Sequence, residues 1–296
     1  MQLNLGLAPA PLRFCVLGSG SAGNSVVVES GSHRVLVDAG FSCKQIEKRL
    51  QAMGIDPPSV DSIVLTHEHG DHVRGAAHFA KRNQATIYAT RGTLEKSGLA
   101  DKPVPSVELA SSQPRRIGGF LIHPFTVPHD AREPIGVVVE DGSRRRVGVA
   151  CDLGTASRLA WAHLADLDAL VVETNHDLEM LRRGPYPWHL KQRVAGRHGH
   201  LSNREAAEGL AELISARLQW VVLYHLSRTN NSPALAAEAI DRVLREHGSN
   251  ARVCVSEQVV PTPWMVVEDL PAAEPVTVVE SPGPKDQLEG RPAQNG

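Results

Sequence analysis

The sequence predicts an α/β fold in which two β-sheets pack face to face and helices cover their outer surfaces. Short apolar runs rich in β-branched residues recur in two series along the chain, and amphipathic segments separate and follow them. Polar residues suited to chemistry come directly after several of these runs. Because functional groups are commonly carried on loops at the edge of a rigid scaffold, we expect a site along one edge of the sheets.

The first series of predicted strands begins as an antiparallel meander. Its strands span residues 14–17, 26–28 and 34–37, and Gly31 and Ser32 mark a hairpin turn. A helix is predicted from Ser42, with an amphipathic stretch at 44–53 and Gly54 at its end, before a strand at 62–66. Further strands are predicted at 86–89, 120–124, 135–140, 146–150, 169–173 and 220–223, with helices near 155–165, 203–217 and 233–247.

The composition is ordinary for a globular protein, with 42% hydrophobic and 22% charged residues. A net charge of -2 argues against a protein that coats nucleic acid, although a local basic patch remains compatible with it. We find no stretch apolar enough for a membrane span and no signal-peptide pattern, so we expect no membrane partner and a cytoplasmic location. The 4 cysteines are scattered without a Cys-x-x-Cys pair, which indicates neither a zinc knuckle nor a disulfide framework.

A dense cluster of metal-ligating side chains follows the predicted strand at 62–66. His67, His69, Asp71 and His72 place three imidazoles and one carboxylate on one short loop. Imidazole and carboxylate suit Zn²⁺ and neighbouring divalent metals, and such a loop can divide its ligands between two ions, His67 and His69 for one and Asp71 and His72 for the other. A solvated His-rich loop is the alternative, which this density disfavours.

A loop of this size cannot complete two coordination spheres, so further ligands are expected at the ends of rigid strands. His129, Asp152 and His225 each follow a predicted strand. Any one of them alone would be interpreted as a structural residue. Together with the first loop they become candidate ligands.

In order and spacing, these seven residues resemble the ligand set of the metallo-β-lactamase superfamily. The resemblance covers about residues 12–266, which we treat as one hydrolase domain, and implies an αββα four-layer sandwich. It implies His67, His69 and His129 on a first metal, Asp71, His72 and His225 on a second, and Asp152 bridging both. Asp38, at the end of a predicted strand, would hydrogen-bond a ligand histidine, or else be an ordinary turn residue.

Two metals by themselves indicate only hydrolysis, so lactams, thioesters, lactones and phosphodiesters all remain as substrates. Phosphodiester cleavage leaves an alkoxide that needs a proton, and His200 backed by Glu173 would be a suitable general acid. The alternatives for this pair are a helix-capping neighbour and a salt-bridging glutamate. The pair resembles the proton shuttle of the tRNA-maturing ribonuclease Z branch, which implies catalytic roles for Glu173 and His200 beside Asp71.

Five segments, at 18–25, 128–131, 173–177, 199–203 and 225–231, resemble the YycJ/WalJ group of the superfamily. The resemblance implies a 5′-to-3′ DNA exonuclease with two divalent ions, Zn²⁺ before Mn²⁺. An RNA-processing enzyme or a small-molecule phosphodiesterase of the same fold is the alternative, and a binding protein is disfavoured because every ligand position is filled. Cys151 departs from the small hydroxyl residue expected there, which leaves it either buried or in contact with metal.

The segment 181–203 is basic, contains no acidic residue and carries Tyr186 and Trp188. Such a loop fits a phosphate backbone and stacked bases, although it could also be merely solvated. The candidate phosphate contacts are Arg197 in this segment and Ser227, Asn230 and Asn231 beyond it. The last three could instead cap the helix predicted near 233.

The glycine-rich run at 18–23 satisfies the dinucleotide-binding pattern G-x-G-x-x-G after a strand. That pattern requires a helix N-terminus to receive a pyrophosphate, whereas the next segment predicts a strand. We therefore expect no nicotinamide cofactor. The chain beyond 266 is rich in Pro, Glu, Ala and Gly, so we expect a disordered tail at 267–296.

Overall fold

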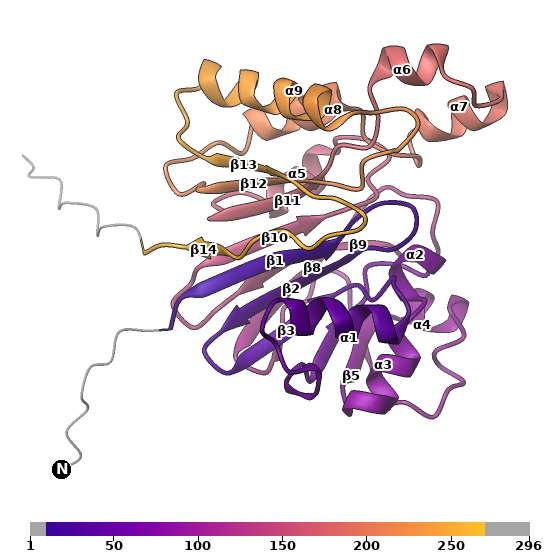
Figure 1. Ribbon diagram of the computed structural model, residues 1–296, viewed down its shortest axis with the longest axis vertical. Coiled ribbons are helices and arrows are strands. Elements are labelled where there is room, and N and C mark those ends of the chain that lie inside the picture. Colours follow the sequence, from indigo (N-terminus) through magenta and orange to yellow (C-terminus); the bar gives the residue numbers. More distant parts are fainter. Residues whose placement is uncertain (1–9, 270–296) are drawn as a thin grey trace, which may run out of the picture.

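Two seven-stranded sheets form the centre of the molecule, and helices cover both outer faces (Figure 1). The structure is a computed structural model and describes residues 10–269. The strand order is β14-β1-β2-β3-β4-β5-β6 in the first sheet and β13-β12-β11-β10-β9-β8-β7 in the second. This arrangement confirms the predicted αββα sandwich.

The first sheet changes from antiparallel to parallel pairing along its width. Its strands are β1 (Leu12–Gly18), β2 (Ser25–Ser30), β3 (His33–Val37), β4 (Ser62–Val64), β5 (Thr86–Thr90), β6 (Ser106–Leu109) and β14 (Met265–Val267). The meander β1-β2-β3 is antiparallel, as predicted, and β3 to β6 run parallel. Because parallel strands end at the same edge, β3 and β4 deliver their following loops side by side.

The second sheet repeats this change of pairing. It contains β7 (Arg115–Ile117), β8 (Phe120–Thr126), β9 (Ile135–Glu140), β10 (Arg146–Ala150), β11 (Ala169–Glu173), β12 (Trp220–Tyr224) and β13 (Arg252–Val255). Strands β7 to β10 are antiparallel, and β10 to β13 are parallel. The ends of β8, β10, β11 and β12 therefore meet at a common edge.

Helices form the two outer layers. The first layer contains α1 (Cys43–Ala52), the 3₁₀ turn η1 (Pro57–Ser59), α2 (Gly70–Val73), α3 (Ala76–Asn83) and α4 (Arg91–Lys96). The second contains α5 (Arg158–His163), α6 (Leu178–Arg183), α7 (Trp188–Val194), α8 (Asn203–Ala211) and α9 (Pro233–Glu246). Helix α8 ends at Ala211, earlier than the predicted 203–217, and the Glu212 and Leu213 N–H groups beyond it donate to carbonyls three residues back, those of Gly209 and Leu210.

Three hydrophobic clusters hold the four layers together. One lies between the sheets and includes Val26 and Val28, and a second packs the outer face of the first sheet against α1 and α3 with Val27 in between. The third joins the second sheet to α5, α8 and α9. Strand β2 is buried on both faces, which explains its unbroken apolar run.

The two ends of the described chain lie close to each other in the first sheet. Val267, the first residue of the expected disordered tail, pairs with Leu12 at the end of β14. The rest of that predicted tail, from residue 270 on, lies outside the described residues. Among the described helices, none combines the length and apolarity needed to cross a bilayer.

Candidate active site

The predicted metal-ligating residues all lie at one edge of the sandwich. The loop carrying residues 67–72 follows β4 in the first sheet, whereas His129, Asp152 and His225 follow β8, β10 and β12 in the second. Asp152 and His225 have left-handed backbone conformations, with φ of 51° and 57°. Non-glycine residues seldom adopt this conformation, and it concentrates where surrounding structure holds functional groups in place.

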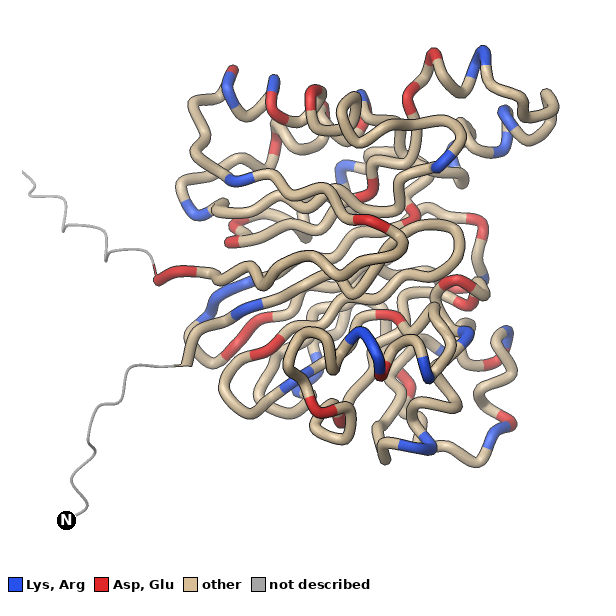
Figure 2. Tube along the Cα trace, viewed as in Figure 1, with Lys and Arg blue, Asp and Glu red and all other residues tan. Residues whose placement is uncertain are grey.

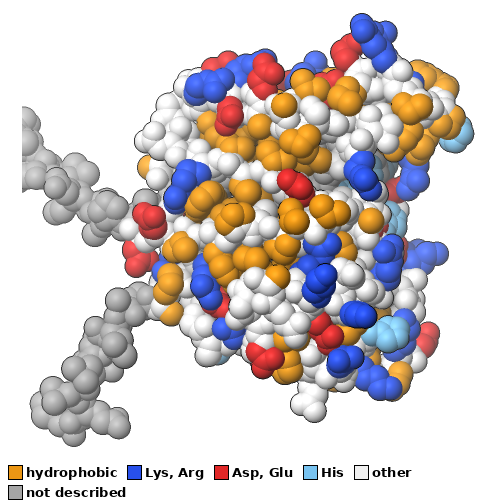
Figure 3. Space-filling model, viewed as in Figure 1, with side chains coloured by type: hydrophobic (Ala, Val, Ile, Leu, Met, Phe, Trp, Pro, Cys, Tyr) orange, Lys and Arg blue, Asp and Glu red, His pale blue; other side chains and the backbone are white. Residues whose placement is uncertain are grey.

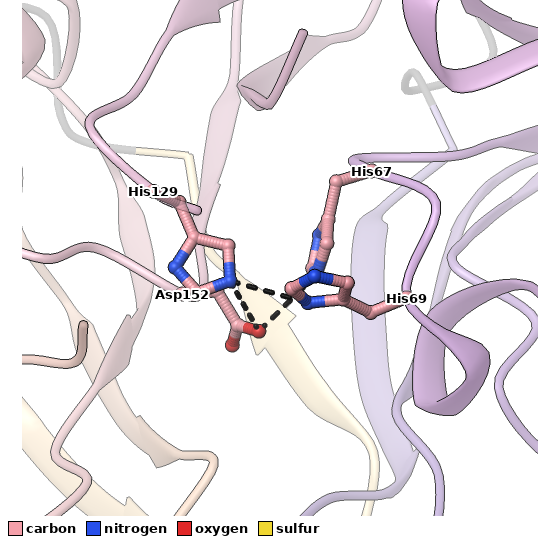
Figure 4. Close-up of side chains that lie close together, drawn as sticks. All are labelled: His67, His69, His129 and Asp152. Atoms are coloured by element: carbon pink, nitrogen blue, oxygen red, sulfur yellow. Dashed lines mark hydrogen bonds and ion pairs between the residues drawn. The ribbon is translucent and has the colours of Figure 1, made fainter. Parts of the chain in front are cut away.

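The first cluster joins side chains from both sheets (Figure 4). His67, His69, His129 and Asp152 offer ligand atoms that all lie within 4.8 Å of one another. The Nε2 atom of His67 is 3.3 Å from Asp152 Oδ2, and Nε2 of His129 is 3.3 Å from Nδ1 of His69. The four side chains therefore converge on one point.

A second cluster lies beside the first and contacts its Asp152. Asp71, His72 and His225 also offer ligand atoms within 4.8 Å of one another. His225 Nε2 lies 3.3 Å from Asp71 Oδ2, and His72 Nε2 lies 3.3 Å from Asp152 Oδ2. The Asp152 oxygen that faces His67 thus also faces His72, between the two clusters.

Outer hydrogen bonds fix the orientation of the imidazole rings. His72 Nδ1 donates to Asp38 Oδ2 at 2.7 Å, which is the contact expected for Asp38, and His129 Nδ1 donates to the Gly199 carbonyl at 3.0 Å. A proton on Nδ1 leaves Nε2 as the lone-pair atom, and in both rings Nε2 faces the clusters.

The donor set fits divalent cations. His67 Nε2 and Asp152 Oδ1 are buried and form no hydrogen bond of good geometry within the described chain; their polar neighbours are Asp152 Oδ2 at 3.3 Å and His225 Nδ1 at 3.2 Å, both members of the same ligand set. Burying such atoms without a partner is costly, and a cation between the side chains would satisfy them. Burial lowers the pKa of His67 to about 4, so this ring is neutral and able to ligate at neutral pH.

The carboxylates of the second cluster require positive charge. Burial would raise the pKa of Asp71, but the hydrogen bond from His225 and the charge of His72 outweigh it and lower the pKa to about 2. Burial likewise opposes protonation of His225, but Asp152, Asp71 and Glu173 together raise its pKa to about 10. A bound cation would replace that proton, because metal binding and protonation compete for the same atoms.

Glu173 and His200 form the predicted pair beside this centre. His200 Nδ1 lies 2.6 Å from Glu173 Oε1, and Glu173 Oε2 accepts from the backbone N–H groups of Leu153 at 2.7 Å and Leu201 at 3.2 Å. Glu173 is fully buried, whereas the His200 side chain is 21% exposed. Burial opposes the charged form of His200, but the negative charge of Glu173 prevails and raises the His200 pKa.

His200 of this pair lines a cavity of about 470 Å³, which we call the active-site cavity. His225 lines the same cavity. The basic segment contributes Tyr186, Leu190 and Arg193 to its wall. Arg193 pairs with Asp130 of the same lining at 2.7 Å, whereas Arg228, also in the lining, has no acidic partner among the described residues. A partly aromatic ligand with negative charge near Arg228 would be complementary to this cavity.

Two of the four candidate phosphate contacts lie in the active-site cavity and two do not. Ser227 and Asn230 line the active-site cavity, whereas Arg197 and Asn231 do not. For Asn231 the structure corrects the expectation, since its amide group donates to the Thr174 carbonyl and to Asn203 Oδ1, both at 2.8 Å. Arg197 is exposed on a turn and is not part of the cavity lining.

The strand β2 follows the glycine-rich run, as predicted, where the dinucleotide-binding pattern would require a helix. Its side chains instead support the metal-ligating residues, a role that the sequence analysis missed. Ser19 Oγ accepts from the His225 N–H at 2.7 Å, and Asn24 Nδ2 donates to Asp71 Oδ2 at 3.2 Å. Sequence periodicity cannot reveal these supporting hydrogen bonds, because they join residues that meet only in the folded structure.

Cys151 is buried beneath the second cluster. Its thiol lies 3.7 Å from Asp38 Oδ2 and 3.8 Å from Thr66 Oγ1, and burial raises its pKa to about 12. The thiol is therefore protonated at neutral pH and contacts supporting residues. Burial, one of the two roles left open for Cys151, is observed, and its Sγ also lies within 4.8 Å of ligand atoms of Asp38 and His72.

Comparisons with known proteins agree with this geometry. A family model described as a beta-lactamase superfamily domain matches residues 33–226. The chain belongs to this superfamily. It is 33% identical to exodeoxyribonuclease YycJ of Bacillus anthracis over 80% of this chain and 90% of the relative. It is 34% identical to exodeoxyribonuclease WalJ of Streptococcus pneumoniae over 76% of this chain and 85% of the relative.

Solved structures confirm the metallo-β-lactamase fold. The metallo-β-lactamase fold protein YhfI from Bacillus subtilis superposes with a TM-score of 0.67 at 18% identity, over 86% of this chain and 99% of the other. Superfamily membership and the two His/Asp clusters identify the chain as a metal-dependent hydrolase that uses divalent ions.

Proposed function

We propose that the protein is a 5′-to-3′ DNA exonuclease with two divalent cations, Zn²⁺ in preference to Mn²⁺. The Glu173–His200 pair carries this proposal, because His200 is a proton donor beside the two clusters and lines a partly aromatic cavity that also contains Arg228. The names of the YycJ and WalJ relatives support DNA as the substrate. A cytoplasmic location remains a prediction.

The seven candidate ligands would hold two cations, one at each cluster. His67, His69 and His129 would hold one, Asp71, His72 and His225 the other, and Asp152 would contact both. Imidazole-rich sets with few carboxylates favour Zn²⁺ over harder cations. When bound, the pair of cations supplies Lewis-acid stabilisation of the attacking and leaving oxygens of a phosphodiester.

The chain's own residues would manage the leaving group and the substrate. Glu173 orients His200 through Nδ1, which leaves Nε2 free to protonate the departing alkoxide. Ser227 and Asn230 would contact phosphate oxygens, while Arg228 would supply positive charge at the cavity wall, where Arg193 is paired with Asp130. Tyr186, and the 71% exposed Trp188 beside it in sequence, would stack against bases.

The decisive experiment is digestion of 5′-labelled and 3′-labelled duplex and single-stranded DNA by metal-loaded protein. Stepwise, metal-dependent loss from the 5′ end that disappears in EDTA and in Asp71→Ala is expected. Asp101→Ala, which removes an exposed carboxylate on a loop, is the matched control and should digest normally. Activity that persists in Asp71→Ala would identify a contaminant, and cleavage of RNA or bis(p-nitrophenyl) phosphate without DNA would shift the substrate class.

A further inference from the structure

A second cavity lies outside the candidate active site, on the helical layer of the first sheet. It has a volume of about 780 Å³ and lies between the start of α1, the end of α2 and the helix α3. Its lining includes Lys44, Arg74, His78, Lys81 and Arg82, which we call the basic pocket, and all five are exposed. Figure 2 shows Lys and Arg positions along α1 and α3, and Figure 3 shows basic side chains over the same region.

The charges of the basic pocket are largely without acidic partners. Arg82 pairs with Glu47, with Nε 3.0 Å from Oε1. Lys44, Arg74 and Lys81 form no ion pair with an acidic side chain anywhere in residues 10–269, and no carboxylate lines the cavity. Like charges held together without counter-charge create a local positive potential that attracts anions.

The basic pocket adjoins the active-site cavity across the glycine-rich loop. Arg74 Nη1 donates to the Ala22 carbonyl at 3.0 Å, and Ser21, one residue earlier, lines the active-site cavity. The lining of that cavity also contains Arg228, which has no acidic partner among the described residues, and Arg193, which pairs with Asp130. Basic side chains therefore flank the metal-ligating clusters in two places, with the glycine-rich loop between the basic pocket and the candidate centre.

We propose that the basic pocket binds backbone phosphates of the duplex part of a DNA substrate while one strand end occupies the active-site cavity. The inference rests on the proposed function, in which DNA is the substrate. A polymer with regularly repeated anions can occupy both cavities at once, whereas a small phosphodiester in the active-site cavity cannot. The contacts are ion pairs to phosphate, so they position the duplex without regard to base sequence.

The test compares two charge-matched variants in metal-loaded, full-length protein. Lys44→Gln/Lys81→Gln removes two charges of the basic pocket from exposed positions. Arg242→Gln/Arg245→Gln removes two exposed charges from α9 in the opposite outer layer. Binding of a fluorescent, cleavage-resistant DNA duplex is measured over a salt series, beside turnover of bis(p-nitrophenyl) phosphate.

The basic-pocket variant should bind the duplex on the order of tenfold more weakly at moderate salt. The slope of log affinity against log salt should become shallower by about 1 to 2, since each phosphate contact contributes roughly 0.9. Turnover of bis(p-nitrophenyl) phosphate should be unchanged, and the α9 variant should bind as the unmodified protein does. As a second readout, the duplex should protect Lys44 and Lys81 from acetylation and leave exposed Lys102 reactive.

Equal weakening in both variants would overturn the inference, because the effect would then come from net charge alone. Unchanged duplex binding in the basic-pocket variant, or weakened binding of duplex RNA but not DNA, would overturn it as well. Unmodified protein that binds the duplex but never digests DNA would refute the proposed exonuclease, while the comparison of variants would still decide the basic pocket. Protein that does not bind DNA at all would refute both.

Discussion

Removal of the His200 imidazole should slow DNA digestion far more than hydrolysis of an activated phosphodiester. His200→Ala removes the proposed proton donor, whose contribution is typically about 10²–10⁴-fold. Because the side chain is 21% exposed, water can reach its place and act as a weaker acid. We therefore expect a loss of about 10²–10³-fold on DNA, or roughly 3–4 kcal/mol in activation free energy.

The assay compares kcat on DNA with kcat on bis(p-nitrophenyl) phosphate, whose nitrophenolate leaves without needing a proton. The second substrate should lose only a few-fold. His247→Ala removes an exposed histidine at the end of α9 and should change neither rate. Glu173→Gln is a poorer probe, because Glu173 also accepts from two buried backbone N–H groups. Equal losses on both substrates would refute the role of His200 as a proton donor.

The pH dependence gives an independent check on the same residue. Burial opposes a charged His200, but Glu173 outweighs it and raises the pKa above the ordinary 6.5. A general acid must hold its proton, so DNA digestion should be sustained below this raised pKa and fall as the pH rises through it. That alkaline limb should be absent from the residual activity of His200→Ala.

Three further perturbations test the scaffold. Gly40→Ala should abolish metal binding, because the added Cβ would lie 1.7 Å from the Asp71 carbonyl oxygen. The metal content of the purified variant measures this. Gly142→Ala is the control and should bind metal normally, since a Cβ added there has no atom within 4 Å. Arg145→Ala should lower the free energy of unfolding in urea by about 3–5 kcal/mol, since Arg145 is 5% exposed and pairs with Asp141 at 2.6 Å. Activity per folded molecule should be unchanged. Its exposed neighbour Arg144 is the control, and equal losses would contradict the argument. EDTA should lower the Tm by roughly 5–10 °C, because bound metal contributes about 3 kcal/mol to stability when its free concentration is well above its Kd. An unchanged Tm would argue against tight metal binding.

The central strands could be predicted from sequence because burial on both faces demands unbroken β-branched runs. Strand β2, with Val26, Val27 and Val28 fully buried, is an example. The strands β6, β7, β13 and β14 and the short helices α2, α3, α4, α6 and α7 were not predicted. Strand β6 has the burial pattern exposed, half-buried, exposed, buried, and β14 has three residues, so neither carries enough periodicity to be recognised.

The candidate ligands could be located from sequence because their chemistry is concentrated just after strands. Their supports could not, since Ser19 and Asn24 reach His225 and Asp71 only after the chain has folded. The same limit explains Asn231, whose polar side chain is compatible with phosphate binding in sequence but is already committed to Thr174 in the structure. Hydrogen-bond partners distant in sequence leave no local pattern.

The origin of the ligands in both sheets has a consequence for the lifetime of the protein in the cell. The loop after β4 supplies four candidate ligands and the second sheet supplies three, so neither half of the chain holds a complete set. Cation binding is therefore linked to the docking of one half on the other. We expect cells starved of metal to hold a protein whose halves separate more readily, so its degradation by proteases would follow the metal supply.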